Sequence, residues 1–518
     1  MEFSTSNSTI SRPSTIMDHL SILRIVSLVI GLLFVRWIAR GVYRVYFHPL
    51  SRFPGPRFSA FTRLPHLNAV RRGILHKHVA RLHETYGEVV RISPDELSFI
   101  HPNAWRDIYG LGSKEDKGSA PPKAWGKYRN SPNGAYHLLN MPDPVQHARQ
   151  RKIFLPAFSN RALTQQSPLF LRYANQLVSI LKSGGVEGAQ FDLIRVFNFT
   201  TFDIMGDLTF GESLHMLDNA EYDPWVKAIF QNFKRGAQLG LLYNYYPLVA
   251  GVFQAVMHKK VAQAQYAHLN FATSRVTKRL EKGRTSEGVD LWDLIFKQEE
   301  KGKAGLTRDE MDVNAGLFMI AGTETTATVL SGLMYLLCLH PASLAKLVKE
   351  VRSAFPSSDD ITMESAVGLP YLNACIKEGM RMYPPVPIGL PHLTPPEGST
   401  ICGHYVPPGT TVAAPHWPMY YSDTIFRDPK SFVPERWTGD ERYARDERAA
   451  FQPFSVGPRD CLGKNMAYHE MRLLLSKVIF HFDFELGPES DGDWFDQESY
   501  TLWQKKPLLI KVKTATGA

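Results

Sequence analysis

The chain has 518 residues and a formal net charge of +9; 44% of its residues are hydrophobic and 21% are charged. This composition excludes a disordered chain or a coiled coil and is sufficient for a large apolar core. The positive charge suits a membrane surface or an acidic protein, whereas the lack of a dense basic run or zinc motif makes nucleic acid a poor partner. The four cysteines form no C-x-x-C pair, which disfavours a zinc ribbon or a thioredoxin-type redox site, and so few cysteines in a long chain indicate a reducing compartment.

The N-terminal region predicts a disordered tail followed by a membrane anchor. Residues 1–19 begin with a Ser- and Thr-rich stretch, and residues 20–40 are predominantly apolar. Twenty helical residues span roughly 30 Å, the thickness of a bilayer core. Arg36, Arg40 and Arg44 follow at a spacing of four, among aromatic residues, as expected at a cytosolic interface. Because no Ala-x-Ala-like site follows the apolar core, we expect a single-pass signal anchor rather than a cleaved signal peptide.

The remainder predicts a hinge and one large domain. Residues 41–57 are basic and then proline-rich, which stops the helix and stiffens the connection to a domain over 58–518. Alternating residues over 87–100 indicate a pair of short strands. From about Asn140 the pattern is largely helical, apart from a charged, Gly/Lys-rich segment at 282–305 that predicts an exposed loop.

A long helix in the middle of the chain carries an unusual polar cluster. Thr307-x-x-Glu310 is a capping box, and the helix it opens can run to His340, about 50 Å in length. Its apolar middle is interrupted by the sequence Gly322-Thr323-Glu324-Thr325-Thr326. A buried acid is unfavourable without a partner or a function, so this cluster indicates either a solvated patch or a functional site.

Further charged patterns lie on either side of this helix. His147 and Arg151 are four residues apart in a basic helix start, which by itself is compatible with a solvated face. Glu378 and Arg381 are three residues apart on a helix predicted over 372–382, and an exposed pair of this kind contributes under about 1 kcal/mol.

The stretch around Cys461 carries the strongest chemical signal. It reads Phe454-Ser-Val-Gly-Pro-Arg459-Asp-Cys461-Leu-Gly463 and precedes a helix predicted from Lys464 to about residue 480. A thiolate is a soft, strongly donating metal ligand. Glycines allow peptide N–H groups to approach its sulfur, and the following helix N-terminus favours the anion. A buried structural cysteine is the alternative for any isolated cysteine.

Taken together, these motifs resemble those of the cytochrome P-450 superfamily, in the same order, over about residues 45–512. The resemblance implies one mainly helical domain with a small β-rich region, preceded by a single transmembrane helix. It implies heme b as the cofactor, with the thiolate of Cys461 as the axial ligand of the iron. Within this superfamily, the sequence most resembles fungal microsomal members that hydroxylate secondary metabolites.

The resemblance also implies roles for other residues. Glu324 and Thr325 match the acid and alcohol that deliver protons to iron-bound oxygen, with Gly322 leaving room for a diatomic ligand. Glu378, Arg381 and Arg436 match a buried structural network. The residues implied to contact haem beside Cys461 are Phe454, Arg459, Gly463, Arg151, His147 and His392. Among the possible propionate ligands, Arg151 is preferred to His147 because a guanidinium is always charged, and His392 stands where many members have arginine.

We therefore expect a haem-thiolate monooxygenase that inserts one atom of O2 into a small apolar molecule, such as a fungal secondary-metabolite intermediate. Electrons are expected from NADPH through a separate flavoprotein reductase, because the sequence has no dinucleotide-binding fingerprint. The expected location is the endoplasmic reticulum membrane, with the catalytic domain facing the cytosol. The alternatives are a haem-thiolate isomerase or dehydratase that acts without O2, and a non-catalytic membrane haem or lipid binder.

Overall fold

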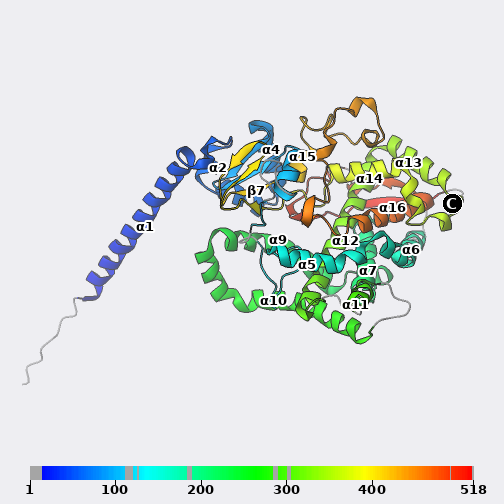
Figure 1. The fold of residues 1–518 in the computed structure, drawn as a ribbon, viewed down its shortest axis with the longest axis horizontal. Helices are drawn as coiled ribbons and strands as arrows, with labels where there is room; N and C mark the ends of the chain where they lie inside the picture. The colour runs from blue at the N-terminus through cyan, green and yellow to red at the C-terminus, as the bar shows by residue number, and fades with distance from the viewer. Residues whose placement is uncertain are drawn as a thin grey trace, which may run out of the picture.

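The computed structural model describes residues 14–110, 121–124, 128–183, 189–283, 290–299, 305–490 and 492–515. The part of the predicted tail before residue 14 lies outside these ranges. The described chain is mainly helical, with several small sheets, and its first helix projects outward from the body (Figure 1). The predicted fold class is therefore confirmed.

Helix α1, Ser14–Tyr46, contains the candidate membrane span. Its segment Leu23–Tyr46 has a mean hydropathy of 1.9, and only 6% of the most apolar window is buried. The helix begins inside the segment predicted as a tail, five residues before the expected boundary at residue 19. Its last turns contact the body, where the Trp37 ring meets Phe61 edge-on at 4.9 Å and Arg91 donates to the carbonyl of Arg44 at 2.8 Å.

The body contains helices that are separated along the chain by short loops and strands. The longer ones are α4 Leu75–Tyr86, α5 Pro144–Phe154, α6 Asn160–Ser183, α7 Leu193–Phe210, α9 Pro224–Tyr245, α10 Pro247–Glu281, α12 Arg308–Leu339, α13 Pro341–Ala354, α14 Pro370–Met382 and α16 Lys464–His481. The shorter ones include α2 Arg57–Phe61, α3 Leu64–Arg71, α8 Met216–Asn219, α11 Leu291–Glu299 and α15 His416–Tyr420.

The sheets are small and join distant parts of the chain. The largest has the strand order β1 Val89–Ser93, β2 Glu96–Phe99, β7 Thr411–Ala413 and β4 His392–Leu393, with β2 and β7 parallel. A second sheet has the order β3 Ala189–Asp192, β11 Leu509–Thr514 and β8 Phe482–Leu486. Two antiparallel pairs, β5 Ser399–Ile401 with β6 His404–Val406 and β9 Ser499–Tyr500 with β10 Leu502–Trp503, complete the list.

Helix α12 forms the centre of the body, as its capping box and apolar middle predict. Thr307 accepts from the backbone of Glu310, and the Glu310 carboxylate accepts in return from the Thr307 backbone N–H at 2.9 Å. The helix also passes the length and hydropathy test for a membrane span, but 72% of its most apolar window is buried inside the protein. It packs against α7, nearly all of whose residues are buried. The length of α12 therefore reflects a core position.

The predicted loop over 282–305 is partly wrong, because its middle forms α11. Trp292 of this helix is fully buried, and its Nε1 donates to the carbonyl of Thr209 at 2.6 Å. One large aromatic side chain thus anchors α11 to the core.

The predicted trio of Glu378, Arg381 and Arg436 is confirmed as a buried network. Arg381 forms a two-pronged pair with Glu378, at 2.7 and 2.9 Å, and Arg436 Nε lies 3.3 Å from the same carboxylate. Trp437 Nε1 also donates to it at 2.8 Å, and Arg436 pairs further with Asp446. The network joins α14 to the segment that leads to the Cys461 loop.

Candidate active site

The loop before α16 holds Cys461 through its own backbone. The Cys461 N–H donates to the carbonyl of Phe454 at 2.9 Å, and the Gly463 N–H donates to the cysteine sulfur. Gly457 has a φ of +80°, and a Cβ there would lie 2.3 Å from the carbonyl oxygen of Tyr109. Glycine is therefore required at 457, and Gly463 supplies the type of donor that tunes a thiolate.

The Cys461 side chain is exposed, although it lies in a crowded part of the fold. Its surface is open, yet enough protein surrounds it for burial to raise the pKa of the thiol. On α12, which packs against α16, Ala321 is exposed and its neighbours one turn away, Leu317 and Thr325, are half-buried. An open strip in the middle of a largely buried helix, together with an open cysteine just before a helix that packs against it, is compatible with a bound apolar cofactor.

Basic side chains gather beside the Cys461 loop. Arg459 donates to the carbonyls of Met141 and Pro142 at 2.6 and 3.0 Å. Lys123 is buried, donates to the carbonyl of Leu139, and pairs through its backbone with His392.

These groups lie close enough to disfavour one another's charge. Burial, and then Arg459, lower the pKa of Lys123 to about 7. Burial, and then Arg459 and Lys123, lower the pKa of His147 to about 3. Burial also lowers the pKa of His392 to about 4, and Lys123 and Arg459 contribute to the shift. The two imidazoles are therefore neutral near pH 7, and an anion that binds beside these groups would favour their charged forms. We call Lys123, His147, His392 and Arg459 the basic cluster; its chemistry fits the propionates of haem.

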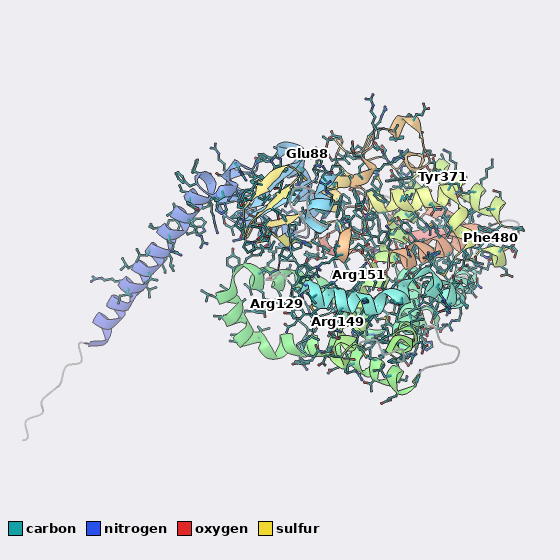
Figure 2. The ribbon with its side chains drawn as sticks, viewed as in Figure 1. Glu88, Arg129, Arg149, Arg151, Tyr371 and Phe480 are labelled. Atoms are coloured by element: carbon teal, nitrogen blue, oxygen red, sulfur yellow. The ribbon has the colours of Figure 1, made fainter. Side chains whose placement is uncertain are left out.

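Arg151, which the resemblance favours over His147 as a propionate ligand, lies beside these groups and pairs with a residue of the Cys461 loop. Its guanidinium donates to the carbonyl of Asp460 at 2.8 Å and pairs with the Asp460 carboxylate. Arg151 therefore braces the residue before Cys461. Figure 2 labels it on α5 together with Arg149, which pairs with Glu310 and so ties α5 to the start of α12.

The polar cluster on α12 is divided between two faces. Thr325 borders the open strip, and its Oγ1 donates to the carbonyl of Ala321 at 2.7 Å. Glu324 is buried on another face, with its Oε1 2.7 Å from Lys505 Nζ. A Cβ at Gly322 would lie 2.8 Å from Met205 Sδ of α7, so close helix packing accounts for this glycine.

Two hollows on the outer surface flank the Cys461 loop. One of about 330 Å³ includes His147, Arg151, Lys152 and Arg459 in its lining. The other, of about 140 Å³, includes Phe454, Lys377 and Lys464. The surface around the loop is therefore basic.

The comparisons with known proteins agree with this geometry. The family model described as "Cytochrome P450" matches residues 53–512. The chain is a member of the cytochrome P450 family. The P450 monooxygenase efuB of Hormonema carpetanum is 44% identical to it over 482 residues, which are 92% of this chain and 94% of that protein. FUM2 of Gibberella moniliformis, also a P450 monooxygenase, is 42% identical over 92% of this chain and 100% of its own. A third P450 monooxygenase, AMT3 of Alternaria alternata, is 39% identical over 91% of this chain and 95% of its own.

As a P450, the protein is an oxygen-incorporating oxidoreductase that uses haem with a cysteine thiolate ligand. Its activity implies a small substrate, O2 and a redox partner, and α1 is a weak sign of membrane attachment. Sequence reasoning missed Lys123 and Lys505 in this site. Neither lies in a motif, and only the fold brings them to Arg459 and Glu324.

Another buried acid of this P450, Glu470 on α16, predicts a pH-dependent stability. Burial raises its pKa to about 8 from an ordinary 4.5, although a hydrogen bond with Thr326 opposes the shift. Because the unfolded chain ionises first as pH rises, this contribution to stability is fully present below about pH 4.5 and declines up to about pH 8. We expect Glu470→Gln to stabilise the protein at pH 8 by roughly 3 kcal/mol and to have little effect at pH 5.

The measurement is thermal unfolding of the full chain in detergent at both pH values. Glu485→Gln is the matched control, since Glu485 is an exposed acid. Equal effects of Glu470→Gln at pH 5 and pH 8 would show that Glu470 is ionised in the folded protein.

Proposed function

We propose that this P450 inserts one oxygen atom from O2 into a small apolar molecule, with Cys461 as the ligand of heme b iron. The substrate class we propose is a fungal secondary-metabolite intermediate, supported by the fungal origin of its P450 monooxygenase relatives. The main support is the Cys461 loop, where an open cysteine receives a backbone N–H just before α16, a helix that packs against α12. The reduced, carbon-monoxide-bound absorption spectrum tests the ligand.

When bound, the thiolate-ligated haem supplies the activation of O2. The protein contributes binding, exclusion of water and movement of protons. The basic cluster would bind the propionates, and Phe454, whose ring lies 5.1 Å from that of Tyr468, would shield the cysteine sulfur. Thr325 presents a hydroxyl on the open strip, and such a group both donates and accepts, so it passes protons onward. Glu324, one residue before it, supplies the exchangeable proton.

We further propose that electrons come from NADPH through a separate flavoprotein reductase that docks on the basic hollows around the loop. Arg151, Lys152, Lys377 and Lys464 give this surface a charge complementary to an acidic protein. The proposed location is the endoplasmic reticulum membrane, with α1 as the single-pass anchor and the body in the cytosol. The arginines that follow the apolar part of α1 support this orientation.

Replacement of Thr325 tests the proton relay. In Thr325→Ala the open strip loses its hydroxyl, so we expect NADPH to be consumed with O2 while most of the electrons appear as hydrogen peroxide. A roughly tenfold or greater fall in product per NADPH is the expected size, within the range of lost proton-transfer catalysis. The measurement is the ratio of peroxide to NADPH in membranes reconstituted with a P450 reductase.

The matched control is Thr323→Ala. Thr323 is a buried threonine on the same helix, and its hydroxyl bonds the carbonyl of Met319 at 2.6 Å. Unchanged coupling in Thr325→Ala would remove the relay. Turnover that proceeds without NADPH would instead favour an isomerase or dehydratase.

A further inference from the structure

Lys505 is the buried partner of Glu324. It lies in the segment between β10 and β11, and its Nζ is 2.7 Å from Glu324 Oε1. Only 4% of the Lys505 side chain and 2% of the Glu324 side chain are exposed. A lysine is almost never fully buried unless it is paired, so the burial of Lys505 depends on its pairing with Glu324.

The ammonium of Lys505 is fully engaged by neighbouring groups. Besides Glu324, it donates to Thr328 Oγ1 at 3.0 Å and to Asn198 Oδ1 at 3.4 Å. Thr328 in turn donates to the carbonyl of Glu324 at 2.7 Å, and Asn198 Nδ2 donates to the hydroxyl of Tyr222 at 3.0 Å. An ammonium has three hydrogens, so all of its donors are used. Lys505 is thereby fixed between α12 and α7.

The two carboxylate oxygens of Glu324 differ in their hydrogen bonding. Oε1 is held by Lys505, whereas Oε2 is buried and has no hydrogen-bond partner among the residues that the structure describes. A buried carboxylate oxygen without a hydrogen-bond partner is destabilising, and binding a proton or a water molecule relieves this cost.

We propose that Lys505 is the positioning residue for Glu324: it holds Oε1 in place, so that Oε2 is the oxygen that takes up and releases the proton. This inference rests on the proposed function, in which Glu324 supplies protons. It assigns to a lysine outside every recognised motif the task of orienting that acid.

The surrounding charges are consistent with this role. Burial raises the pKa of Glu324, and Lys505 opposes that shift. Burial lowers the pKa of Lys505, and Glu324 and then Asp192 oppose it. The other titratable groups facing the pair are Tyr222 and Tyr383, both of which are phenols that burial keeps neutral. Lys505 is therefore the cation that lets Glu324 ionise in an apolar setting.

The test follows the protonation of Glu324 directly by infrared difference spectroscopy of the full haem-loaded chain in detergent as pH is changed. The carbonyl band of a protonated acid is assigned to Glu324 by its loss in Glu324→Gln. In Lys505→Met we expect the midpoint of that band to move upward by about 1–3 pH units, the usual effect of an opposite charge at this distance.

Lys506→Met is the matched control. Lys506 is exposed, it loses the same charge from the same segment, and the backbone carbonyl that accepts from Trp494 is retained. We expect its midpoint to equal that of the wild type. Lys505→Arg restores the charge and is expected to move the midpoint back toward the wild-type value.

A Glu324 midpoint that is the same in Lys505→Met and in the wild type overturns the inference. If Lys505→Met does not fold, Lys505→Gln replaces it, since glutamine keeps a donor for Oε1 but has no charge; an unmoved midpoint there has the same meaning. The carbon-monoxide spectrum separates this failure from that of the proposed function. A wild type that binds no thiolate-ligated haem overturns the function, whereas an unmoved midpoint beside a normal spectrum overturns only the role of Lys505.

Discussion

Cys461→Ser is expected to abolish the strongly red-shifted Soret band of the reduced, carbon-monoxide-bound protein and to reduce turnover to background. A serine hydroxyl is not ionised near neutral pH and is not the soft donor that a thiolate is. The loop itself should persist, because the bond from residue 461 to the Phe454 carbonyl involves only backbone atoms. The spectrum of the membrane fraction, recorded for wild type and variant, measures the effect.

Cys402→Ser serves as the control for loss of a thiol. Cys402 is half-buried in the turn between β5 and β6, and burial raises its pKa to about 12, so it is a neutral thiol. We expect its variant to keep the wild-type spectrum. A red-shifted band that survives in Cys461→Ser would remove the proposed ligand and with it the proposed function.

The helices that could be predicted are those whose signals are local. Thr307 and Glu310 form a capping box within one turn, and Pro341 follows the end of α12. Both ends of this helix are therefore marked by residues close to them in the sequence. The segment that became α11 lacks such signals. Its position depends on Trp292 reaching a carbonyl of α7, a contact that no short window of sequence contains.

In the site too, residues within one short motif could be predicted, whereas contacts between distant parts of the chain could not. Cys461 and Gly463 lie in one short motif, and the N–H that meets the sulfur comes from within it. Charge and spacing alone do not reveal that Arg151 pairs with Asp460, because that contact joins α5 to the Cys461 loop. Lys123 and Lys505 were missed because their significance comes only from groups that the fold brings to them.

Loss of Glu378 is expected to have the largest effect on stability, because two buried arginines share its carboxylate. Burial alone would raise the pKa of Glu378, but Arg381 and Arg436 hold it below its ordinary value of 4.5. The network therefore stabilises the fold above that pH, and this contribution is lost as pH falls further. Glu378→Ala leaves Arg381 without an acidic partner in a fully buried position. The expected loss at pH 7 is about 3–5 kcal/mol in the free energy of unfolding.

Denaturant-induced unfolding of the full chain in detergent measures this loss, and Glu485→Ala provides the comparison. Glu485 is exposed and lies 3.7–3.8 Å from Lys511 and Lys513, so its removal should change stability by less than about 1 kcal/mol. If Glu378→Ala were equally mild, the buried arginines would have found water or other acceptors. Arg381 also donates to the carbonyls of Tyr420 and Ser431, at 3.0 and 2.9 Å, so it keeps hydrogen-bond acceptors when Glu378 is removed. The main contribution of Glu378 is therefore its negative charge, which neutralises the buried guanidinium. Glu378→Gln separates these terms, because it keeps an acceptor but removes the charge, and we expect it to be almost as destabilising as alanine.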